Sequence, residues 1–247
     1  MAKNEPNQSI HSFTLDSYIE LIEAILEKGY QPVTYAQADP AKKHIILRHD
    51  VDFDLDSAVT MAEREVGHGL HATYFVMLRS EFYSITSDSG LCAVKKLAAL
   101  GHEIGLHFDA SIYNAEKEDL VQKVSLEAES LSSLIGLPVT SMSLHRPSPV
   151  LLDQELNIDG LINSYSSKYF NSFGYCSDSN GGWHHGHPMK HDAIASGLGL
   201  HLLTHPIWWV GGNEEPLQKL HSFLRRRSKF LEDQLALNCK LFHNHTL

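Results

Sequence analysis

Two carboxylates stand two positions apart at the end of a short apolar run, since Asp50 and Asp52 follow residues 44–48. Alternate residues of an extended chain point to the same side, so both carboxylates can face one site. In such a pair, one carboxylate can bind a cation while the other accepts a proton. Acidic residues after a strand also cap helices, which is the role expected of Asp54 or Asp56. The pair alone is compatible with either chemistry or capping.

A histidine and a third carboxylate end a second apolar segment. The run GHEIGLHFD at 101–109 closes on His107 and Asp109, a nitrogen and an oxygen donor suited to zinc or another borderline divalent metal. The alternative is that His107 only donates a hydrogen bond to a backbone carbonyl. The chain has seventeen histidines, and histidine serves both as a metal ligand and as a general acid or base.

Two more segments end on charged residues. In SLHRPSP at 143–149, Arg146 can hold a carboxylate base ionised through a bidentate pair, or it can form a plain structural ion pair. In HLLTHP at 201–206, His205 can serve as a general acid. His201 is expected in the core or behind the site.

Apolar runs and amphipathic segments alternate along the chain, a pattern typical of parallel strands with helices outside. Strands are expected at 44–48, 71–77, 102–106, 140–144 and 199–204, and helices at 14–29, 54–66, 91–100, 117–135 and 214–237. The stretch 147–198, between the last two expected strands, has a less regular pattern. The carboxyl ends of parallel strands meet at one rim, where catalytic groups gather. We therefore expect one site from the residues that follow these strands: Asp50, Asp52, His107, Arg146 and His205.

The composition narrows the class of protein. The chain has 247 residues with 20 basic and 30 acidic side chains, a net charge of −10, which argues against nucleic acid or an anionic membrane as a partner. Apolar residues make up 43%, as in a folded globular protein rather than a disordered chain. Three cysteines are too few for a disulfide framework. No apolar run approaches the ~20 residues that span a bilayer, and no signal-peptide pattern is visible, so we expect a cytoplasmic protein.

Together, the motifs resemble the polysaccharide deacetylase family, the NodB-homology carbohydrate esterases, over about residues 44–209. The segment ATYFV at 72–76 also looks like the second barrel strand of that family. The resemblance implies a single α/β domain, 1–247, built as a distorted (β/α)7 barrel. A helical extension is expected at 1–43, and a C-terminal helix packed on the barrel is expected at 210–247. The chain resembles a divergent, intracellular member of the family.

The same resemblance implies a reaction and a role for each candidate residue. The reaction is metal-dependent removal of an acetyl group from a sugar or a surface-polysaccharide precursor, N-acetyl in preference to O-acetyl, with zinc as the expected ion. The roles are general base for Asp50, metal ligand for Asp52 and His107, orientation of the base for Arg146, and catalytic acid for His205. Neither the motifs nor the resemblance predicts an oligomeric state.

One position departs from the family pattern. A second metal histidine usually follows the first by four residues, and Ser111 stands there instead. The two ligands named above are then one short of the usual three. Asp109 is the nearest replacement, with His145 or Asp178 as alternatives.

Two other functions are compatible with the motifs. A barrel that kept the fold and lost hydrolysis would bind a saccharide or a partner protein, and Ser111 favours this alternative. A metal-dependent glycosyltransferase would use Asp50 and Asp52 to bind a nucleotide sugar. Such enzymes place an open sheet before the acidic pair, however, and only one strand is expected before it here. The deacetylase is therefore the leading prediction.

Overall fold

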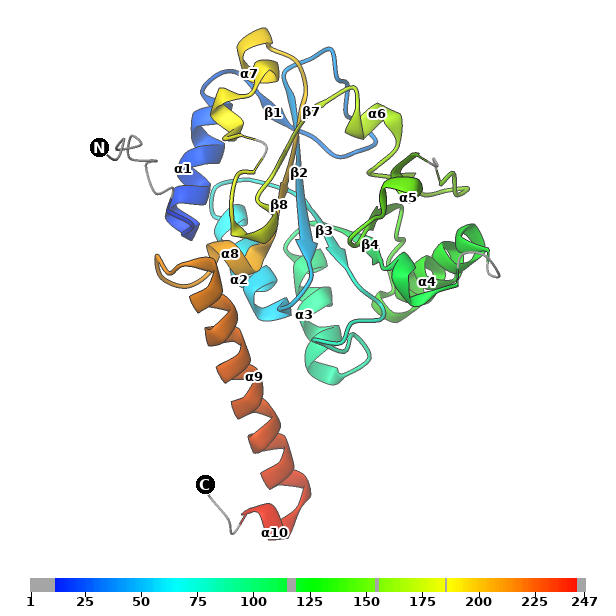
Figure 1. Ribbon diagram of the computed structural model, residues 1–247, viewed down its shortest axis with the longest axis vertical. Coiled ribbons are helices and arrows are strands. Elements are labelled where there is room, and N and C mark those ends of the chain that lie inside the picture. The colour runs from blue at the N-terminus through cyan, green and yellow to red at the C-terminus, as the bar shows by residue number, and fades with distance from the viewer. Residues whose placement is uncertain (1–11, 115–118, 154–155, 185, 244–247) are drawn as a thin grey trace, which may run out of the picture.

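The computed structural model describes residues 12–114, 119–153, 156–184 and 186–243, and its centre is a sheet of eight parallel strands (Figure 1). The strands are β1 (Gln31–Pro32), β2 (His44–Val51), β3 (Thr73–Val76), β4 (Glu103–Phe108), β5 (Ser141–Leu144), β6 (Ile162–Asn163), β7 (Gly174–Ser177) and β8 (Leu200–Thr204). The α-helices are α1 (Leu15–Leu26), α2 (Leu55–Val66), α3 (Asp88–Ala99), α4 (Leu120–Ile135), α5 (Pro149–Asp153), α6 (Ser167–Phe170), α7 (Asp192–Ser196), α8 (Pro206–Trp209), α9 (Pro216–Asn238) and α10 (Lys240–His243). Short 3-10 turns are η1 (Ala110–Ile112), η2 (Ser179–Gly181) and η3 (Pro188–Lys190). The first residues of the extension expected at 1–43 and of the helix expected at 117–135 lie outside the described residues.

Strands β2 to β8 follow one another around a barrel in chain order. From β2 the pairing runs through β3, β4 and β5 to β6 in one direction, and through β8 to β7 in the other. The first and last barrel strands therefore close on each other, and the order ends at β6 and β7. This arrangement confirms the predicted distorted (β/α)7 barrel. Strand β1 adds to the start of β2, where Gln31 lies opposite His44.

Side chains of β2 alternate between two apolar cores. Ile45 and Leu47 belong to the large core that includes residues of the surrounding helices, whereas Ile46 belongs to a smaller, separate cluster. Arg48 and Asp50 lie two and four residues beyond Ile46 and so point to the same side, into the barrel. Both are buried. The barrel interior thus contains the charged side chains of Arg48 and Asp50 beside the smaller apolar cluster.

Gly105 allows close packing across one layer of the barrel. A β-carbon at this position would lie 2.4 Å from the Phe75 ring and 2.9 Å from Ser141 Oγ. Any larger residue would have to displace a buried aromatic ring or a strand. The second glycine of the 101–109 motif is therefore required by packing.

Helix boundaries follow their sequence signals closely. The Asp54 side chain accepts a hydrogen bond from the Asp56 amide at the start of α2, as expected for an N-cap. Helix α4 begins after Asp119 and ends at Gly136, which has a φ of 75°. The stretch expected to be irregular supplies two short strands, β6 and β7, which complete the barrel order.

Helix α9 runs away from the barrel instead of lying along it (Figure 1). Among its 23 residues, the buried ones are Lys219 and Phe223, both within the first eight residues of the helix. Helix α9 therefore contacts the barrel through its first part. Within the described part of the chain, neither α9 nor any other helix is long and apolar enough to cross a membrane.

Candidate active site

Three side chains of types that can bind a metal converge at the carboxyl ends of β2, β4 and β5. Asp52 Oδ1 lies 3.0 Å from His107 Nε2 and 3.3 Å from His145 Nδ1, and the two nitrogens are 3.1 Å apart. His107 is buried and the other two residues are half-buried. We call these three residues the metal group, because each offers a donor atom to the same point.

The spacing of the donor atoms fits a tetrahedral ion. Ligands at about 2.0–2.2 Å from Zn²⁺ lie roughly 3.3–3.6 Å from one another in that geometry. The observed separations of 3.0, 3.1 and 3.3 Å reach the lower end of this range to within a few tenths of an ångström. Unshared electron pairs at such distances repel one another unless a cation or a proton lies between them. Three protein ligands leave the fourth position open, as in catalytic zinc sites.

A serine behind His107 determines which ring nitrogen faces the metal position. His107 Nδ1 lies 2.6 Å from Ser143 Oγ, and that hydroxyl donates to Asp50 Oδ1 at 3.4 Å. Because the Ser143 hydroxyl donates its proton to the Asp50 carboxylate, its oxygen accepts a hydrogen bond from His107 Nδ1–H. Nε2 is then left unprotonated toward the metal position. Hydrogen bonds of this kind orient most metal-binding histidines.

His145, and not Asp109, completes the metal group. Asp109 Oδ1 accepts hydrogen bonds from Ser111 N at 2.9 Å and Ser111 Oγ at 2.6 Å, and Oδ2 accepts from Arg146 Nη2 at 3.0 Å. Asp109 therefore caps the turn η1. Of the residues considered for the third ligand, His145 lies with Asp52 and His107, whereas Asp109 is paired with Ser111 and Arg146.

Arg48, rather than Arg146, pairs with Asp50. Arg48 Nε lies 2.9 Å from Oδ1 and Nη2 lies 2.7 Å from Oδ2, a bidentate pair between two buried side chains. Arg146 has a φ of 46°, its side chain is 71% exposed, and its partner is Asp109. Burial raises the pKa of Asp50, but the Arg48 guanidinium outweighs it and the pKa lies below its usual value. Asp50 is therefore ionised, 3.8 Å from His107 Nε2.

His205, at the end of β8, is held by Asp178, which follows β7. Asp178 Oδ1 accepts from His205 Nδ1 at 2.6 Å, and Oδ2 accepts from the His205 amide at 3.0 Å and from Trp209 Nε1 at 2.6 Å. Nε2 of the ring lies 3.8 Å from Asp52 Oδ2. Burial lowers the pKa of His205, but the attraction of Asp178 outweighs it and raises the pKa to about 9. His205 therefore carries a proton at neutral pH, and Asp178 orients it instead of binding metal.

The predicted residues meet at one rim, apart from Arg146 and Asp109, which pair with each other. Two residues of the site, Arg48 and Ser143, are not among the predicted ones. A signal for Arg48 exists in the sequence, because it precedes Asp50 by two residues on the same strand and so faces the same side. His201 is fully buried, as expected for a core residue, and its Nε2 lies 2.8 Å from the Tyr35 hydroxyl.

A buried glutamate braces the strand ends from the helix side of the sheet. Glu65 of α2 is fully buried and accepts hydrogen bonds from the Tyr74 hydroxyl at 2.6 Å and from His49 Nε2 at 2.9 Å. His49 Nδ1 in turn lies 2.7 Å from Thr204 Oγ1. His49 and Thr204 each directly precede one of the two candidate acid–base residues. The network therefore ties together the two strands that carry them.

Replacing Glu65 by glutamine should destabilise the protein by about 1–3 kcal/mol at neutral pH, because a buried charged hydrogen-bond acceptor is lost. Burial raises the pKa of Glu65, but the His49 imidazole outweighs it, so the folded-state pKa lies below the usual value. The carboxylate therefore stabilises the fold above the unfolded-state pKa of about 4.3, and this contribution is lost as pH falls through the folded-state value. Urea unfolding of both proteins across this range should show the difference shrinking on acidification. A difference that grows as the pH falls would contradict this assignment.

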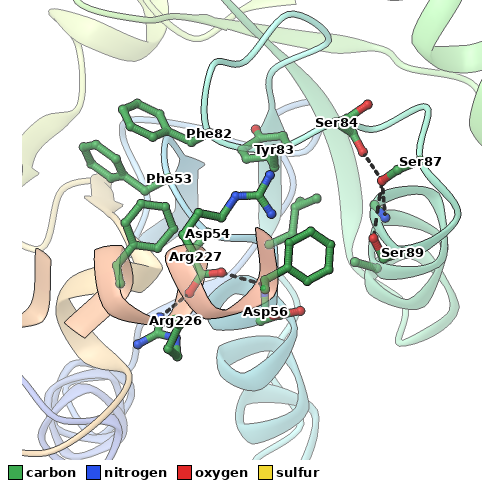
Figure 2. A pocket seen from close by; sticks show the side chains of 15 residues that line it. Phe53, Asp54, Asp56, Phe82, Tyr83, Ser84, Ser87, Ser89, Arg226 and Arg227 are labelled. Atoms are coloured by element: carbon green, nitrogen blue, oxygen red, sulfur yellow. Dashed lines mark hydrogen bonds and ion pairs between the residues drawn. The ribbon is translucent and has the colours of Figure 1, made fainter. Parts of the chain in front are cut away.

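A cavity of about 260 Å³ lies apart from the metal group, beside α2, α3 and α9 (Figure 2). Its lining includes Phe53, Phe82 and Tyr83 together with Arg226 and Arg227 of α9. No member of the metal group and neither acid–base residue is among the lining side chains. This cavity is therefore distinct from the candidate active site.

Solved structures with a similar fold are found at low sequence identity. A family 4 carbohydrate esterase from Bacillus anthracis is 19% identical, with 85% of this chain and 86% of that chain covered and a TM-score of 0.45. A CE4 family pseudoenzyme from the same organism is 13% identical at a TM-score of 0.44; 81% of this chain is covered, but only 64% of that one. The chitin deacetylase of the fungal pathogen Colletotrichum lindemuthianum is 15% identical, with 80% and 86% covered and a TM-score of 0.42. No family model and no curated protein matches the chain.

Proposed function

We propose that this chain is a metal-dependent hydrolase that removes an acetyl group from a sugar. The proposal rests on one observation, the meeting at a single barrel rim of the metal group, Asp50 in its pair with Arg48, and His205 in its pair with Asp178. Amide hydrolysis needs a base and an acid in opposite protonation states at the same pH. Arg48 and Asp178 maintain those two states.

The side chains of the site divide the steps of hydrolysis among them. A divalent ion held by the metal group, with Zn²⁺ favoured by its two nitrogens and one oxygen, would polarise the acetyl carbonyl and acidify a water molecule. Asp50 accepts the proton of the attacking water, and Arg48 fixes both of its oxygens. His205 gives a proton to the departing atom, and Asp178 fixes its ring so that Nε2 faces the metal group.

The state of His205 supports an N-acetyl substrate over an O-acetyl one. An amine is a poor leaving group until it is protonated, so amide hydrolysis depends on a general acid more strongly than ester hydrolysis does. A histidine with a raised pKa is charged at neutral pH and meets that demand. The substrate class we propose is an acetamido sugar of a surface polysaccharide or of its precursor.

Acetate release tests this function directly. Protein stripped with a chelator and reloaded with Zn²⁺, Co²⁺ or Mn²⁺ should release acetate from N-acetylglucosamine oligomers, and the stripped protein should not. O-acetylated xylan serves as the matched ester substrate. Metal binding without release from any acetylated sugar would favour the catalytically silent barrel. Binding of a uridine diphosphate sugar with Mn²⁺ and no loss of acetyl would favour the glycosyltransferase.

Replacing Asp178 by asparagine should move the alkaline limit of activity to lower pH. The acid form of His205 is lost as pH rises through its pKa of about 9, so wild-type activity should decline above that value. An amide at 178 removes the attraction that raises the pKa and leaves the burial that lowers it. Activity on the alkaline side should fall about tenfold for every pH unit by which this limit moves down. Profiles of kcat/KM against pH locate the alkaline limit in the wild type and in the variant. The acidic limb of each profile is the internal control. An alkaline limb at the same pH in both proteins would refute the role of Asp178.

A further inference from the structure

The longest helix carries an apolar stripe that the barrel does not cover. Leu217, Leu224, Leu231 and Leu235 are 66%, 58%, 52% and 50% exposed, and we call these four residues the leucine stripe. At 100° per residue they lie within about 40° of one another around α9. Half of the large hydrophobic side chains that are exposed in the described residues belong to α9 or α10.

A different face of α9 contacts the rest of the protein. Phe223 is buried with its ring centroid 6.0 Å from that of Phe82, and Arg226 Nη2 lies 2.8 Å from Asp54 Oδ2 (Figure 2). This face is turned by about 130° from the leucine stripe. When this face packs on the barrel, the leucine stripe therefore points away from it. Beyond the contact, α9 continues to α10 without touching the barrel (Figure 1).

The spacing of the leucine stripe indicates that its partner is a helix. Intervals of seven, seven and four residues place the four leucines at the core positions of a coiled coil. An apolar patch of this kind on a soluble protein marks an interaction site. A helical segment without tertiary packing is also only marginally stable in water when it is shorter than ~12–15 residues, so a partner would stabilise the free part of α9.

We propose that the partner is a second copy of this chain, with the two α9 helices antiparallel. Arg225 and Glu232 are both exposed and lie seven residues apart on one flank of the stripe. In an antiparallel helix pair, equivalent flanks of the two helices face each other, so Arg225 meets Glu232 of the partner subunit. Because the dimer has a two-fold axis, it contains this ion pair twice. The same alignment sets Leu224 against Leu235 of the partner subunit. It also places the two barrels at opposite ends of the helix pair.

A parallel pair matches the charges less well. It would set Glu232 beside Arg227 of the partner subunit, but Arg227 is half-buried and its guanidinium carbon lies 4.9 Å from the Phe230 ring. Arg227 also lines the cavity beside the barrel. Arg225 is therefore the arginine that is placed to meet a second copy.

Sedimentation equilibrium of the full chain tests the interface. Wild type should show a reversible dimer, and the double variant Leu224→Lys, Leu231→Lys should be monomeric at the same concentrations. Leu237→Lys is the matched control, because Leu237 is 79% exposed on the same helix but lies about 140° from the stripe. A monomeric wild type at every soluble concentration, or a dimer that survives the double variant, would overturn the proposal. The interface does not depend on deacetylase activity, so either result is independent of the acetate assay.

Charge reversal tests the antiparallel arrangement without touching the leucines. Arg225→Glu and Glu232→Arg should each raise the dimer dissociation constant about tenfold, because two attractive pairs become repulsive. The variant that carries both changes should return to the wild-type value. An Arg225→Glu protein that dimerises as wild type does, or a double reversal that fails to recover, would overturn the antiparallel pairing.

Discussion

The Asp50→Asn variant should lose about 10²–10⁴-fold in acetyl hydrolysis while it keeps its metal. Asparagine has nearly the same volume but cannot accept the proton of the attacking water, and Asp50 is not a member of the metal group. The measurement is acetate release at saturating substrate, with metal content determined on the same sample. Unchanged turnover would show that another side chain is the base. Loss of metal together with activity would place Asp50 among the ligands.

The same substitution disturbs a buried ion pair, and a second variant separates the two effects. Arg48 is fully buried and Asp50 supplies its counter-charge. Removing one member of a buried pair costs about 3–5 kcal/mol, so Asp50→Asn should also lower the free energy of unfolding. Adding Arg48→Gln removes the uncompensated charge and should recover part of the stability and none of the activity. Recovered activity in the double variant would refute the catalytic role.

Loss of either histidine of the metal group should abolish stable metal binding. His107→Ala and His145→Ala each remove one of three donors, so affinity should fall by more than the ~10–100-fold that follows loss of a ligand's hydrogen-bond partner. Asp109→Asn should keep its metal, because Asp109 is occupied by Ser111 and Arg146. Elemental analysis and competition with a chelator measure the content and the affinity.

An exposed histidine elsewhere provides the matched control for these variants. His184 follows the turn η2 and is exposed, so His184→Ala should leave metal content unchanged. Metal loss in this control would show that His184 belongs to a second metal site. If Asp109→Asn lost its metal and His145→Ala kept all of its metal, Asp109 would be the third ligand instead of His145.

Five of the barrel strands could be predicted from apolar runs, because strands buried on both faces leave continuous hydrophobic segments in the sequence. The other two leave no such signal. β6 has only two residues, and β7 reads GYCS, half-buried at its first two positions. Such short strands are defined by pairing with their neighbours, and a local sequence pattern does not contain that information.

The two site residues that lie elsewhere than expected, Asp109 and Arg146, stand where strands end. His145 lies two residues beyond Ser143 of β5 and keeps its direction, whereas Arg146 turns away at a φ of 46°. Asp109 stands one residue past the end of β4 and turns to cap η1. Alternation predicts side-chain direction only while a strand lasts. Beyond it, the backbone conformation of the loop decides, and residue types alone do not specify that conformation.

The Arg48–Asp50 pair has an evolutionary consequence. Asp50 neutralises a charge inside the barrel whether or not any substrate is hydrolysed, so selection for a stable fold would retain it in a lineage that had stopped catalysing. Asp52 and His145 are half-buried rim residues whose donor atoms face the metal position, whereas Arg48 and Asp50 are buried inside the barrel. Drift after loss of function would therefore change these two rim residues before the buried pair. In relatives that share this metal group, we expect Asp52 and His145 to change before Asp50 once catalysis is lost.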